Sequence, residues 1–504
     1  MSKQIRNLGV FLVCCYTALF LQVNRLTVFQ AKELQNDPRN NRQVVRDFSR
    51  PRGTIETVDG VVLAQSVESD DRFKLQRVYP TKDLFAHVTG FFAFQLGSAG
   101  VEKTYNDALA GRTLNFSLKE LGDLFVDRER VGNVTLSLRN DVQEVAREEL
   151  AGRNGSVVAL DPRNGEILAL YSNPSYDPNV LANHDFTAAA AASDELNNNP
   201  EKPTRARTYM ERKPPGSTFK IVTATAGIEH GGVTADSPSY PVQSEYRAAS
   251  FGQPIGNFGG GSCGGTLFVI LQESCNTAFA QMGVENATAL GLTDSASDFG
   301  FNASVPIDLP GGVRSVWPTE KVANDPPVLA QSSIGQNEVS ATPLQMALVA
   351  AAVANGGKIM VPHVMREVRD GQQDVVDRFD PEVWTTAMTP DTAELLRQAM
   401  ISVVTDGTAR NLDNGLDGNI VVGGKTGTAQ IGNEDSSHAW IIGFAGPEGE
   451  PPTVAVAVIV EAQPGVSEQT GGAVAAPIAA AVLKQALTAP ARPDAGATAT
   501  NSSG

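Results

Sequence analysis

Residues 156–171 read SVVALDPRNGEILALY, two short apolar runs on either side of a polar turn. Pro162 and the Asn164-Gly165 pair between the runs are residues that favour tight turns. Apolar runs of this length around such a turn predict an antiparallel β-hairpin. We expect this hairpin to begin the main sheet of the protein.

Three further apolar runs near the end of the chain predict strands that return to this sheet. They cover residues 420–422, 438–445 and 454–460. Turn-forming Gly, Asn, Pro and Glu residues separate them, so we expect the strands to pair antiparallel.

Helical segments lie between and around these sheet halves. The expected helices cover residues 141–150, 217–229, 267–282, 343–355 and the Ala-rich stretch 475–487. A chain that begins a sheet, leaves it for helices and returns predicts an α/β fold class, with helices packed on an antiparallel sheet. We expect this domain to cover residues 153–487.

Length and composition limit the function classes. A chain of 504 residues is too long for one ordinary core, so two or three domains are expected. The net charge of -16 argues against a nucleic-acid partner, because phosphate binding needs a basic surface. With five histidines and no cluster at metal-ligand spacing, neither a catalytic metal nor a cofactor is expected.

The first 24 residues have the pattern of a signal-anchor. Lys3 and Arg6 precede an apolar run over 8–23, and no small-x-small cleavage site follows it. A cleaved signal peptide and a buried helix are the alternatives, since the run is shorter than the roughly 20 residues that span a bilayer comfortably. The positive charges predict a single-pass protein of the cell membrane, with its N-terminus in the cytoplasm and the rest outside.

Residues 25–152 carry no motif with recognisable chemistry, and we expect an elongated α+β pedestal there. A polar linker over 29–46 leads to a hairpin whose turn is Asp59-Gly60. At the other end, residues 488–504 form a low-complexity tail that we expect to be disordered.

Ser217 and Lys220 form the first chemistry-bearing pattern. They follow Pro214-Pro215-Gly216 at the start of an expected helix, where residues three apart share a face. A serine hydroxyl needs an adjacent base, and a lysine serves if burial or a neighbouring positive charge lowers its pKa. The alternative for an isolated match is a helix cap followed by a surface lysine.

Two later patterns supply the other parts of an acyl-transfer site. Ser274 and Asn276 offer a hydroxyl for proton relay and an amide for the substrate backbone. In 425–428, a lysine and two threonines follow a strand and suit a carboxylate, while Gly427 leaves room for substrate at the strand edge. Either pattern alone could be a turn cap or an exposed strand end, but their order and context together favour a site.

Four cysteines are present, and two of them, Cys14 and Cys15, fall inside the N-terminal apolar run. Cys263 and Cys275 remain as a pair that an oxidising compartment would join. Two free thiols, one in a Gly-rich loop and one in a helix, are the alternative.

The three patterns resemble those of the penicillin-binding protein and serine β-lactamase superfamily. Further stretches resemble class B penicillin-binding proteins, the monofunctional D,D-transpeptidases, and within them the actinobacterial penicillin-binding protein A group. They are residues 52–55, 100–102, 160–169, 335–336, 342–347 and 438–440. The resemblance covers nearly the whole chain apart from the tail.

The resemblance implies a role for each residue of the site. Ser217 would be acylated by the penultimate D-Ala of a stem peptide, and Lys220 would be the base. Ser274 and Lys425 would relay protons and supply positive charge, and Asn276 would hold the substrate amide. Thr426 and Thr428 would bind the carboxylate, with the backbone NH groups of Ser217 and Thr428 as the oxyanion hole.

The same resemblance implies the partners. Stem peptides ending in D-Ala-D-Ala would be the donors, an amine of a neighbouring stem peptide the acceptor, and β-lactams covalent inhibitors. Roles in cell division or cell shape, with cell-wall synthesis or division proteins as partners, are also expected. A disulfide between Cys263 and Cys275 resembles one in this group.

Sequence features argue against several rival functions. A β-lactamase needs a deacylating Glu, and Glu195-Leu196-Asn197, which we take for a loop, precedes Ser217 and is in the wrong order. A P-loop needs Gly where the chain has Asn419, and residues 30–152 are too few for a glycosyltransferase. A D,D-carboxypeptidase, with water as acceptor, and a non-catalytic penicillin-binding sensor or scaffold stay open as alternatives.

Overall fold

The computed structural model describes residues 3–26, 48–112, 131–430, 437–463 and 469–489. By its internal contacts the chain divides into two units, residues 1–51 with 66–76, and residues 52–65 with 77–504. The linker expected at 29–46 and the tail from residue 490 onward lie outside the described residues.

The first unit contains helix α1, Lys3–Asn24, which covers the predicted anchor segment. It has 22 residues and a mean hydropathy of 1.5, so it is long and apolar enough to cross a membrane. The hydroxyl of Thr17 donates a hydrogen bond to the Val13 carbonyl oxygen at 2.8 Å, which satisfies this polar group within the helix.

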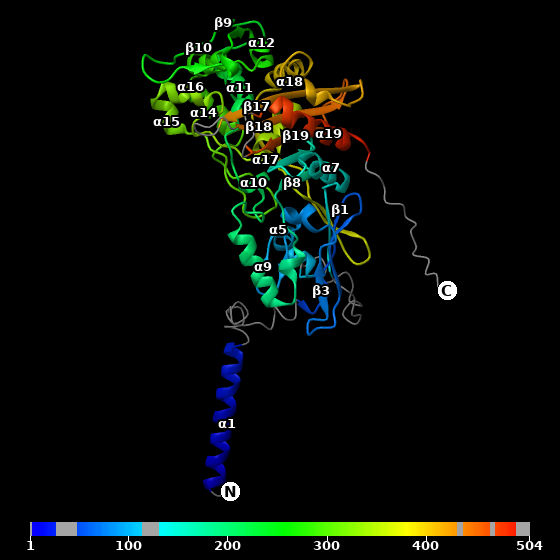
Figure 1. Ribbon diagram of the computed structural model, residues 1–504. Helices are drawn as coiled ribbons and strands as arrows, with labels where there is room; N and C mark the ends of the chain where they lie inside the picture. Colours follow the sequence, from blue (N-terminus) through cyan, green and yellow to red (C-terminus); the bar gives the residue numbers. More distant parts are fainter. Residues whose placement is uncertain (1–2, 27–47, 113–130, 431–436, 464–468, 490–504) are drawn as a thin grey trace, which may run out of the picture. The chain divides into compact units, whose positions relative to one another are not determined.

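The second unit is built on a five-stranded sheet in the order β17-β18-β19-β7-β8 (Figure 1). The strands are β7 Gly155–Leu160, β8 Ile167–Asn173, β17 Ile420–Gln430, β18 Ser437–Pro447 and β19 Val454–Val460. Each neighbouring pair is antiparallel. The predicted hairpin and the return of the C-terminal strands to the same sheet are therefore confirmed.

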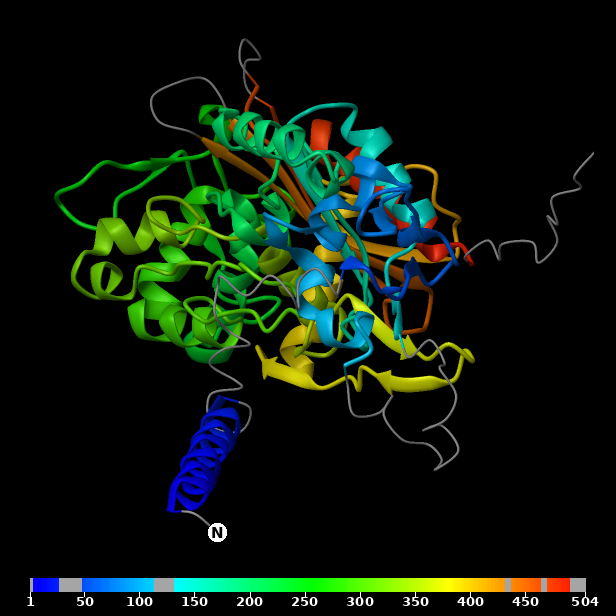
Figure 2. The same ribbon diagram turned by 90° about the horizontal axis from the view of Figure 1, so that it is seen from below.

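Helices cover both faces of this sheet. Helix α17, Pro343–Ala354, packs on one face against β7, β18 and β19, and every residue of it is buried. Helix α18, Pro390–Thr405, packs against the edge strand β17. Helix α7, Asn140–Leu150, and helix α19, Ala476–Leu487, pack together over the other face, as Figure 2 shows in cyan and red. The threonine before α17 and the one before α18 each cap the helix by accepting a backbone NH, which explains where these helices begin.

Three predicted elements differ from the structure near the site. The helix expected at 217–229 is a 3-10 turn, η5 Gly216–Phe219, followed by α11 Lys220–Gly231. The helix expected at 267–282 is broken into α12 Leu267–Gln272 and α13 Asn276–Gln281. The strand expected to end at residue 422 runs on to Gln430, because β18 continues to pair with it.

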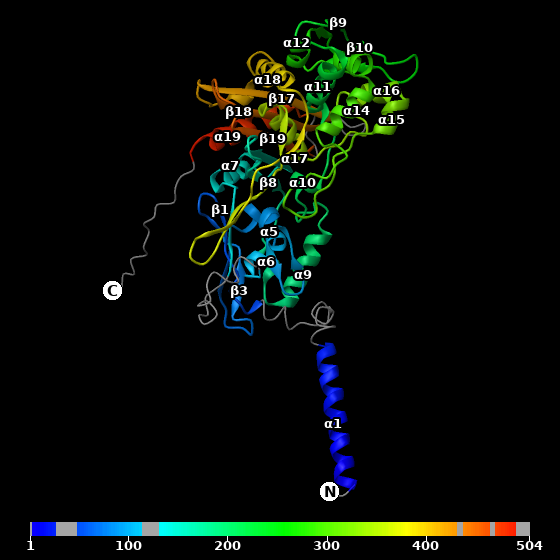
Figure 3. The ribbon, with the colours of Figure 1, turned by 180° about the vertical axis from the view of Figure 1, so that it is seen from behind.

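The region predicted as a pedestal contributes four strands to a six-stranded sheet in the order β15-β14-β6-β1-β2-β3. The strands are β1 Ile55–Thr57, β2 Val62–Glu68, β3 Leu75–Val78, β6 Asn133–Leu136, β14 Met365–Arg369 and β15 Val375–Arg378. The predicted hairpin around Asp59-Gly60 is confirmed by the antiparallel pair β1 and β2. Strands β14 and β15, yellow in Figure 3, come from residues that we assigned to the α/β domain.

A buried charge cluster joins Arg77 of β3 to Arg52, which precedes β1, and to Glu102. Glu102 accepts a hydrogen bond from Nε of Arg52 and another from Nε of Arg77, both at 2.6 Å. Burial opposes ionisation of Glu102, but the two guanidinium groups outweigh it and hold the pKa of Glu102 below its usual value. Two of the stretches that carried the family resemblance, 52–55 and 100–102, thus meet at one ion-pair cluster.

Short elements complete the fold. They are η2 Lys82–Phe85, α4 Ala86–Thr89, β4 Phe92–Ala93, β5 Gly97–Ser98, α5 Gly100–Thr104, α6 Asn106–Leu109, α8 Asn179–Ala182, α9 Phe186–Asn198, α10 Arg207–Met210, β9 Tyr240–Gln243, β10 Glu245–Tyr246, β11 Ile255–Gly256, η6 Phe258–Gly260, β12 Cys263–Gly265, η7 Met282–Ala287, α14 Thr288–Asp298, α15 Thr319–Asn324, α16 Pro326–Ser332, β13 Lys358–Met360, β16 Val383–Thr386, η8 Arg410–Asp413 and η9 Gly471–Ala475.

Candidate active site

The turn that carries Ser217 is fixed by the residues before it. Gly216 has φ +53°, a conformation that favours glycine, and its NH donates to the Gly335 carbonyl oxygen at 3.0 Å. The Thr218 hydroxyl donates to the Pro215 carbonyl oxygen at 2.7 Å and closes the turn. Ser217 is thereby held at the start of η5, and within the described residues its hydroxyl has no hydrogen-bond partner.

Aromatic packing around Phe219 supports the same turn. The Phe219 ring stacks on Trp317 with centroids 5.5 Å apart and meets the edge of Phe301 at 5.3 Å. All three rings are buried. This contact fixes the direction of the backbone between Ser217 and Lys220.

Lys220 is fully buried, and its amine is directed at the second motif. Nζ donates to the Ser274 carbonyl oxygen at 2.7 Å and to Oδ1 of Asn276 at 2.7 Å, and it lies 3.3 Å from Ser274 Oγ. The amine is thus bonded to Ser274 and Asn276 of the second motif.

Ser274 lies at the break between α12 and α13. Its φ of +55° is left-handed, which is costly for a residue other than glycine and explains why the expected continuous helix ends here. The Ser274 hydroxyl also accepts a hydrogen bond from Nζ of Lys425 at 2.7 Å. One hydroxyl is therefore shared by the two buried lysines of the site.

The pKa values of both lysines are lowered. Burial, and after it the charge of Lys425, hold the pKa of Lys220 well below its ordinary value. Burial alone lowers the pKa of Lys425 to about 7. A neutral amine close to neutral pH is what a lysine needs to accept a proton from a serine.

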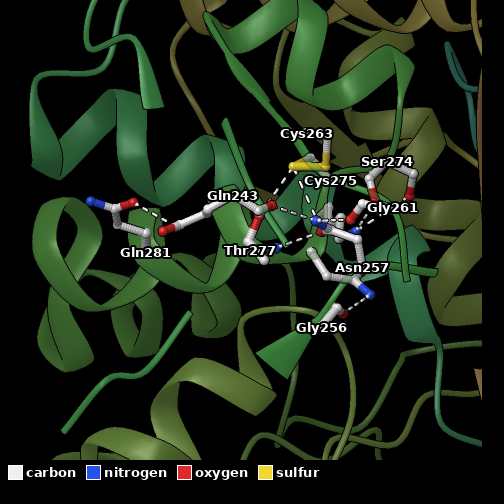
Figure 4. Close-up of a disulfide and its surroundings, with 11 residues drawn as sticks. Gln243, Gly256, Asn257, Gly261, Cys263, Ser274, Cys275, Thr277 and Gln281 are labelled. Atoms are coloured by element: carbon white, nitrogen blue, oxygen red, sulfur yellow. Dashed lines mark hydrogen bonds between the residues drawn. A yellow bond between two sulfur atoms is a disulfide. The ribbon is translucent and has the colours of Figure 1, made fainter. Parts of the chain in front are cut away.

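A disulfide and an asparagine hold the Ser274 loop in place. Cys263 and Cys275 are joined, which confirms the predicted pair and rejects the two free thiols. Asn257 donates to the carbonyl oxygens of Gln243 and Gly261, and its Oδ1 accepts the backbone NH of Thr277 (Figure 4). Sequence reasoning missed Asn257, whose only signal was its place in a Gly-rich loop.

Asn276 is held on both sides of its amide group. Its oxygen accepts from Lys220, and its nitrogen donates to the Gly256 carbonyl oxygen at 3.0 Å. An amide nitrogen carries two hydrogens, so the second one is available to a ligand.

The third motif lies within β17 instead of after it. The hydroxyl of Thr426 is 2.8 Å from that of Thr408, a residue that sequence reasoning missed and that no spacing signal marked. A Cβ on Gly427 would lie 2.9 Å from the Pro215 carbonyl oxygen and 3.0 Å from Cγ2 of Thr218. Gly427 therefore makes room for the Ser217 turn, not for substrate at the strand edge as we expected.

Residues from all three motifs line one cavity of about 1080 Å³. The predicted site residues on its wall are Ser217, Ser274, Asn276, Thr426, Thr428 and Cys263. Lys220 and Lys425 are buried beneath it, and Gly216 packs so closely on β17 that its Cβ would lie 2.9 Å from the Thr428 carbonyl oxygen. The cavity could hold an extended peptide with its carbonyl carbon at Ser217.

An ion pair that sequence reasoning missed secures the segment before Ser217. Glu461, just after β19, accepts from Nζ of Lys213 at 2.9 Å and from Nε of Arg207 at 3.0 Å. Burial alone would raise the pKa of the Glu461 carboxyl. The charges of Lys213 and Arg207 outweigh this effect and hold the pKa below its usual value. The segment that leads to Ser217 is thus tied to the end of the central sheet.

Glu195-Leu196-Asn197 lies on helix α9 and not in a loop, which corrects our interpretation of that stretch. Its residues do not line the cavity. The structure places no β-lactamase-like carboxylate from this stretch at Ser217.

Family comparison identifies two segments of the chain. Residues 155–484 match the penicillin binding protein transpeptidase domain, and residues 52–134 match the penicillin binding protein A dimerisation domain. The first match covers more than half of the chain.

Curated relatives and solved structures agree with these matches. The peptidoglycan D,D-transpeptidase PbpA of Mycolicibacterium smegmatis is 36% identical, covering 97% of this chain and 99% of the relative. PbpA of Mycobacterium tuberculosis is 35% identical with the same coverage. A ceftriaxone acyl-enzyme complex of penicillin-binding protein A from M. tuberculosis superposes with a TM-score of 0.79 at 32% identity, covering 88% of this chain and 100% of that one.

Proposed function

This chain belongs to the penicillin-binding transpeptidase family, and from that premise we propose that Ser217 is its nucleophile. It is a serine-type peptidoglycan D,D-transpeptidase, as its PbpA relatives are, and β-lactams are covalent inhibitors of such enzymes. One observation carries the assignment of the residues: Ser217, Ser274 and Thr426 line a single cavity above two buried lysines.

Lys220 acts as the base for acylation. The Ser217 hydroxyl loses its proton toward Lys220 as Oγ attacks the penultimate D-Ala carbonyl of the donor peptide. The lowered pKa of Lys220 supports this role, because the amine must be neutral to accept the proton. The hydrogen bonds of its amine to Ser274 and Asn276, which both line the cavity, hold the amine next to the cavity.

Ser274 and Lys425 carry the proton to the leaving group. The hydroxyl lies between the two amines, so it can pass a proton to the departing D-Ala nitrogen. An amine of a second stem peptide then attacks the acyl-enzyme, forming the crosslink and restoring the Ser217 hydroxyl.

The remaining site residues bind the donor peptide. Asn276 has one amide hydrogen for a substrate carbonyl, and Thr426 and Thr428 line the cavity wall where a terminal carboxylate would be held. The backbone NH groups of Ser217 and Thr428 form the oxyanion hole, supported by the close packing of Gly216 on Thr428.

The domain organisation follows the same reasoning. We place the anchor at 1–24, a non-catalytic pedestal at 25–152, the transpeptidase domain at 153–487 and a tail at 488–504. A pedestal role for the first part is supported by the absence of cavity-lining residues from its described segments. We expect cell-wall synthesis or division proteins to bind it.

The N-terminal apolar helix is the membrane anchor candidate among the described residues. Lys3 and Arg6 before the apolar run support a cytoplasmic N-terminus and an extracytoplasmic cavity. In spheroplasts, added protease should remove the cavity-bearing part while an N-terminal epitope tag stays protected. Cleavage of the tag in intact spheroplasts would reverse this orientation.

Labelling with a fluorescent penicillin tests the nucleophile. Wild-type protein should form a covalent adduct, and Ser217→Ala should form none. Ser262→Ala is the matched control, since Ser262 lines the same cavity and has no assigned role. An adduct on Ser217→Ala, or none on wild type, would refute the assignment.

A further inference from the structure

Two residues of opposite charge line the catalytic cavity without an ion-pair partner among the described residues. Among the described residues that line it, Glu273 and Arg410 are the charged ones, and all others are neutral. Both are exposed, and neither forms an ion pair with another described residue. The Arg410 guanidinium donates a single hydrogen bond, to the Asp406 carbonyl oxygen at 3.0 Å.

The two residues belong to backbone segments that lie side by side. The NH of Thr408 donates to the Gln272 carbonyl oxygen at 3.2 Å, and a Cβ on Gly407 would lie 3.0 Å from Cα of Gln272. Glu273 follows Gln272, and Arg410 is two residues beyond Thr408. The carboxylate and the guanidinium are thus carried on one wall of the cavity.

This wall adjoins both catalytic motifs. Glu273 directly precedes Ser274, whose hydroxyl is bonded to Lys425 at 2.7 Å. Thr408, next to Arg410 along the wall, bonds to Thr426 at 2.8 Å. A ligand bound by Glu273 and Arg410 would therefore lie beside Ser274, the proposed proton relay for the reacting amine.

We propose that Glu273 and Arg410 form the acceptor subsite and that it takes a primary amine whose carbon also carries a carboxylate. A carboxylate attracts the ammonium form, and a guanidinium binds a carboxylate with two parallel hydrogen bonds. An α-amino acid carries an ammonium group and a carboxylate on the same carbon, so it offers one group to Glu273 and the other to Arg410. The inference rests on the proposed function, because it assumes an acyl-enzyme on Ser217.

The acceptor step balances with these residues. The ammonium first releases one proton to solvent, and the neutral nitrogen attacks the acyl carbonyl carbon. The new C–N bond forms, the C–Oγ bond to Ser217 breaks, and the second amine proton ends on Oγ through the Ser274 hydroxyl. Glu273 and Arg410 bind and orient the acceptor and take no part in these bond changes.

Partitioning of the acyl-enzyme between amine and water tests the subsite. Full-length protein in detergent is given a depsipeptide donor ending in D-alanyl-D-lactate, with D-alanine or D-alaninamide as acceptor. The ratio of aminolysis to hydrolysis product is measured for each acceptor. D-Alaninamide lacks the carboxylate, so only D-alanine can use Arg410.

Arg410→Gln should lower the aminolysis ratio with D-alanine about fivefold, the worth of one exposed charge pair, and leave the ratio with D-alaninamide unchanged. Glu273→Gln should lower both ratios, and Arg410→Lys should restore part of the D-alanine ratio. Arg247→Gln and Glu320→Gln are matched controls, because both residues are exposed and neither lines the cavity.

Wild-type ratios in both Arg410→Gln and Glu273→Gln would overturn the subsite. If Arg410→Gln lowered the aminolysis ratio equally with D-alanine and D-alaninamide, the subsite would also be overturned, because the guanidinium would then not bind the acceptor carboxylate. If wild type forms no acyl-enzyme, the proposed nucleophile fails and the subsite with it. The ratio is measured after acylation, so these failures are distinguishable.

Discussion

Lys220 and Lys425 bring their amines to the same hydroxyl, with Nζ atoms 3.3 and 2.7 Å from Oγ of Ser274. Both side chains are fully buried, one from the start of a helix and the other from the middle of a strand. Two fully buried ammonium groups so close together would repel each other, so the pair favours loss of a proton. The arrangement supplies the neutral amine that acylation requires.

Lys220→Arg should abolish acylation although it keeps the positive charge. Arginine stays protonated at any pH at which the protein is folded, so it cannot accept the Ser217 proton. We expect the rate of labelling by a fluorescent penicillin to fall by at least about 100-fold. Lys358→Arg, at an exposed position away from the cavity, is the control. Near-normal labelling of Lys220→Arg would remove Lys220 as the base.

Lys425→Met should change how stability depends on pH. The pKa of Lys425 is about 7 in the folded protein and about 10.5 in the unfolded chain, so between these values only the unfolded state binds the proton. The free energy of unfolding of wild type should therefore rise with pH by about 1.4 kcal/mol per unit relative to the Met variant.

Denaturant unfolding at pH 7 and pH 9 measures this difference in detergent-solubilised protein. The free energy of unfolding of wild type minus that of Lys425→Met should be larger at pH 9 than at pH 7, by roughly 2 to 3 kcal/mol. If this difference in free energy were the same at both pH values, the pKa of Lys425 would not be lowered by folding.

Gly335→Ala should disturb the turn that holds Ser217. Gly335 has φ +71°, and a Cβ there would lie 2.1 Å from the Gly216 carbonyl oxygen. Backbone atoms cannot yield as a flexible side chain can, so the Ser217 turn must move. We expect slower acylation by at least about tenfold together with a lower midpoint of thermal unfolding.

Gly449→Ala separates the clash from backbone strain. Gly449 has φ +79°, yet no described atom lies within 4 Å of its Cβ position. This variant should cost only about 1 kcal/mol of stability and leave acylation unchanged. If both variants behaved alike, the contact between Gly335 and Gly216 would have no special role.

The sequence was sufficient to predict the five-stranded sheet and to propose most residues of the candidate site. Strands such as 454–460 are continuous apolar runs between turn residues, and both the runs and the turns can be seen without a structure. Ser217 and Lys220 could be proposed as a pair because their spacing along the chain is a local property. The structure also confirmed Cys263 and Cys275 as a pair, since few cysteines were available.

Other features depend on contacts between distant segments. The break at Ser274 could not be predicted, because its left-handed conformation is imposed by the bonds of its carbonyl and hydroxyl to Lys220 and Lys425. Thr408 and Glu461 act through partners far along the chain, and no local pattern marks them. The close approach of Gly427 to Pro215 likewise could not be predicted, because these residues meet only in the tertiary structure.

Thr408→Val should weaken binding of the donor carboxylate. The Thr408 hydroxyl is 2.8 Å from that of Thr426, and when Thr408 donates this hydrogen bond the Thr426 hydrogen is free for a carboxylate. Valine has nearly the same shape but removes this partner, a loss of about 1 kcal/mol. The second-order rate constant for acylation by penicillin should fall about fivefold, mainly through weaker binding. Thr408→Ser keeps the hydroxyl and should react as wild type does, whereas an equal loss in both variants would point to packing of the missing methyl group instead.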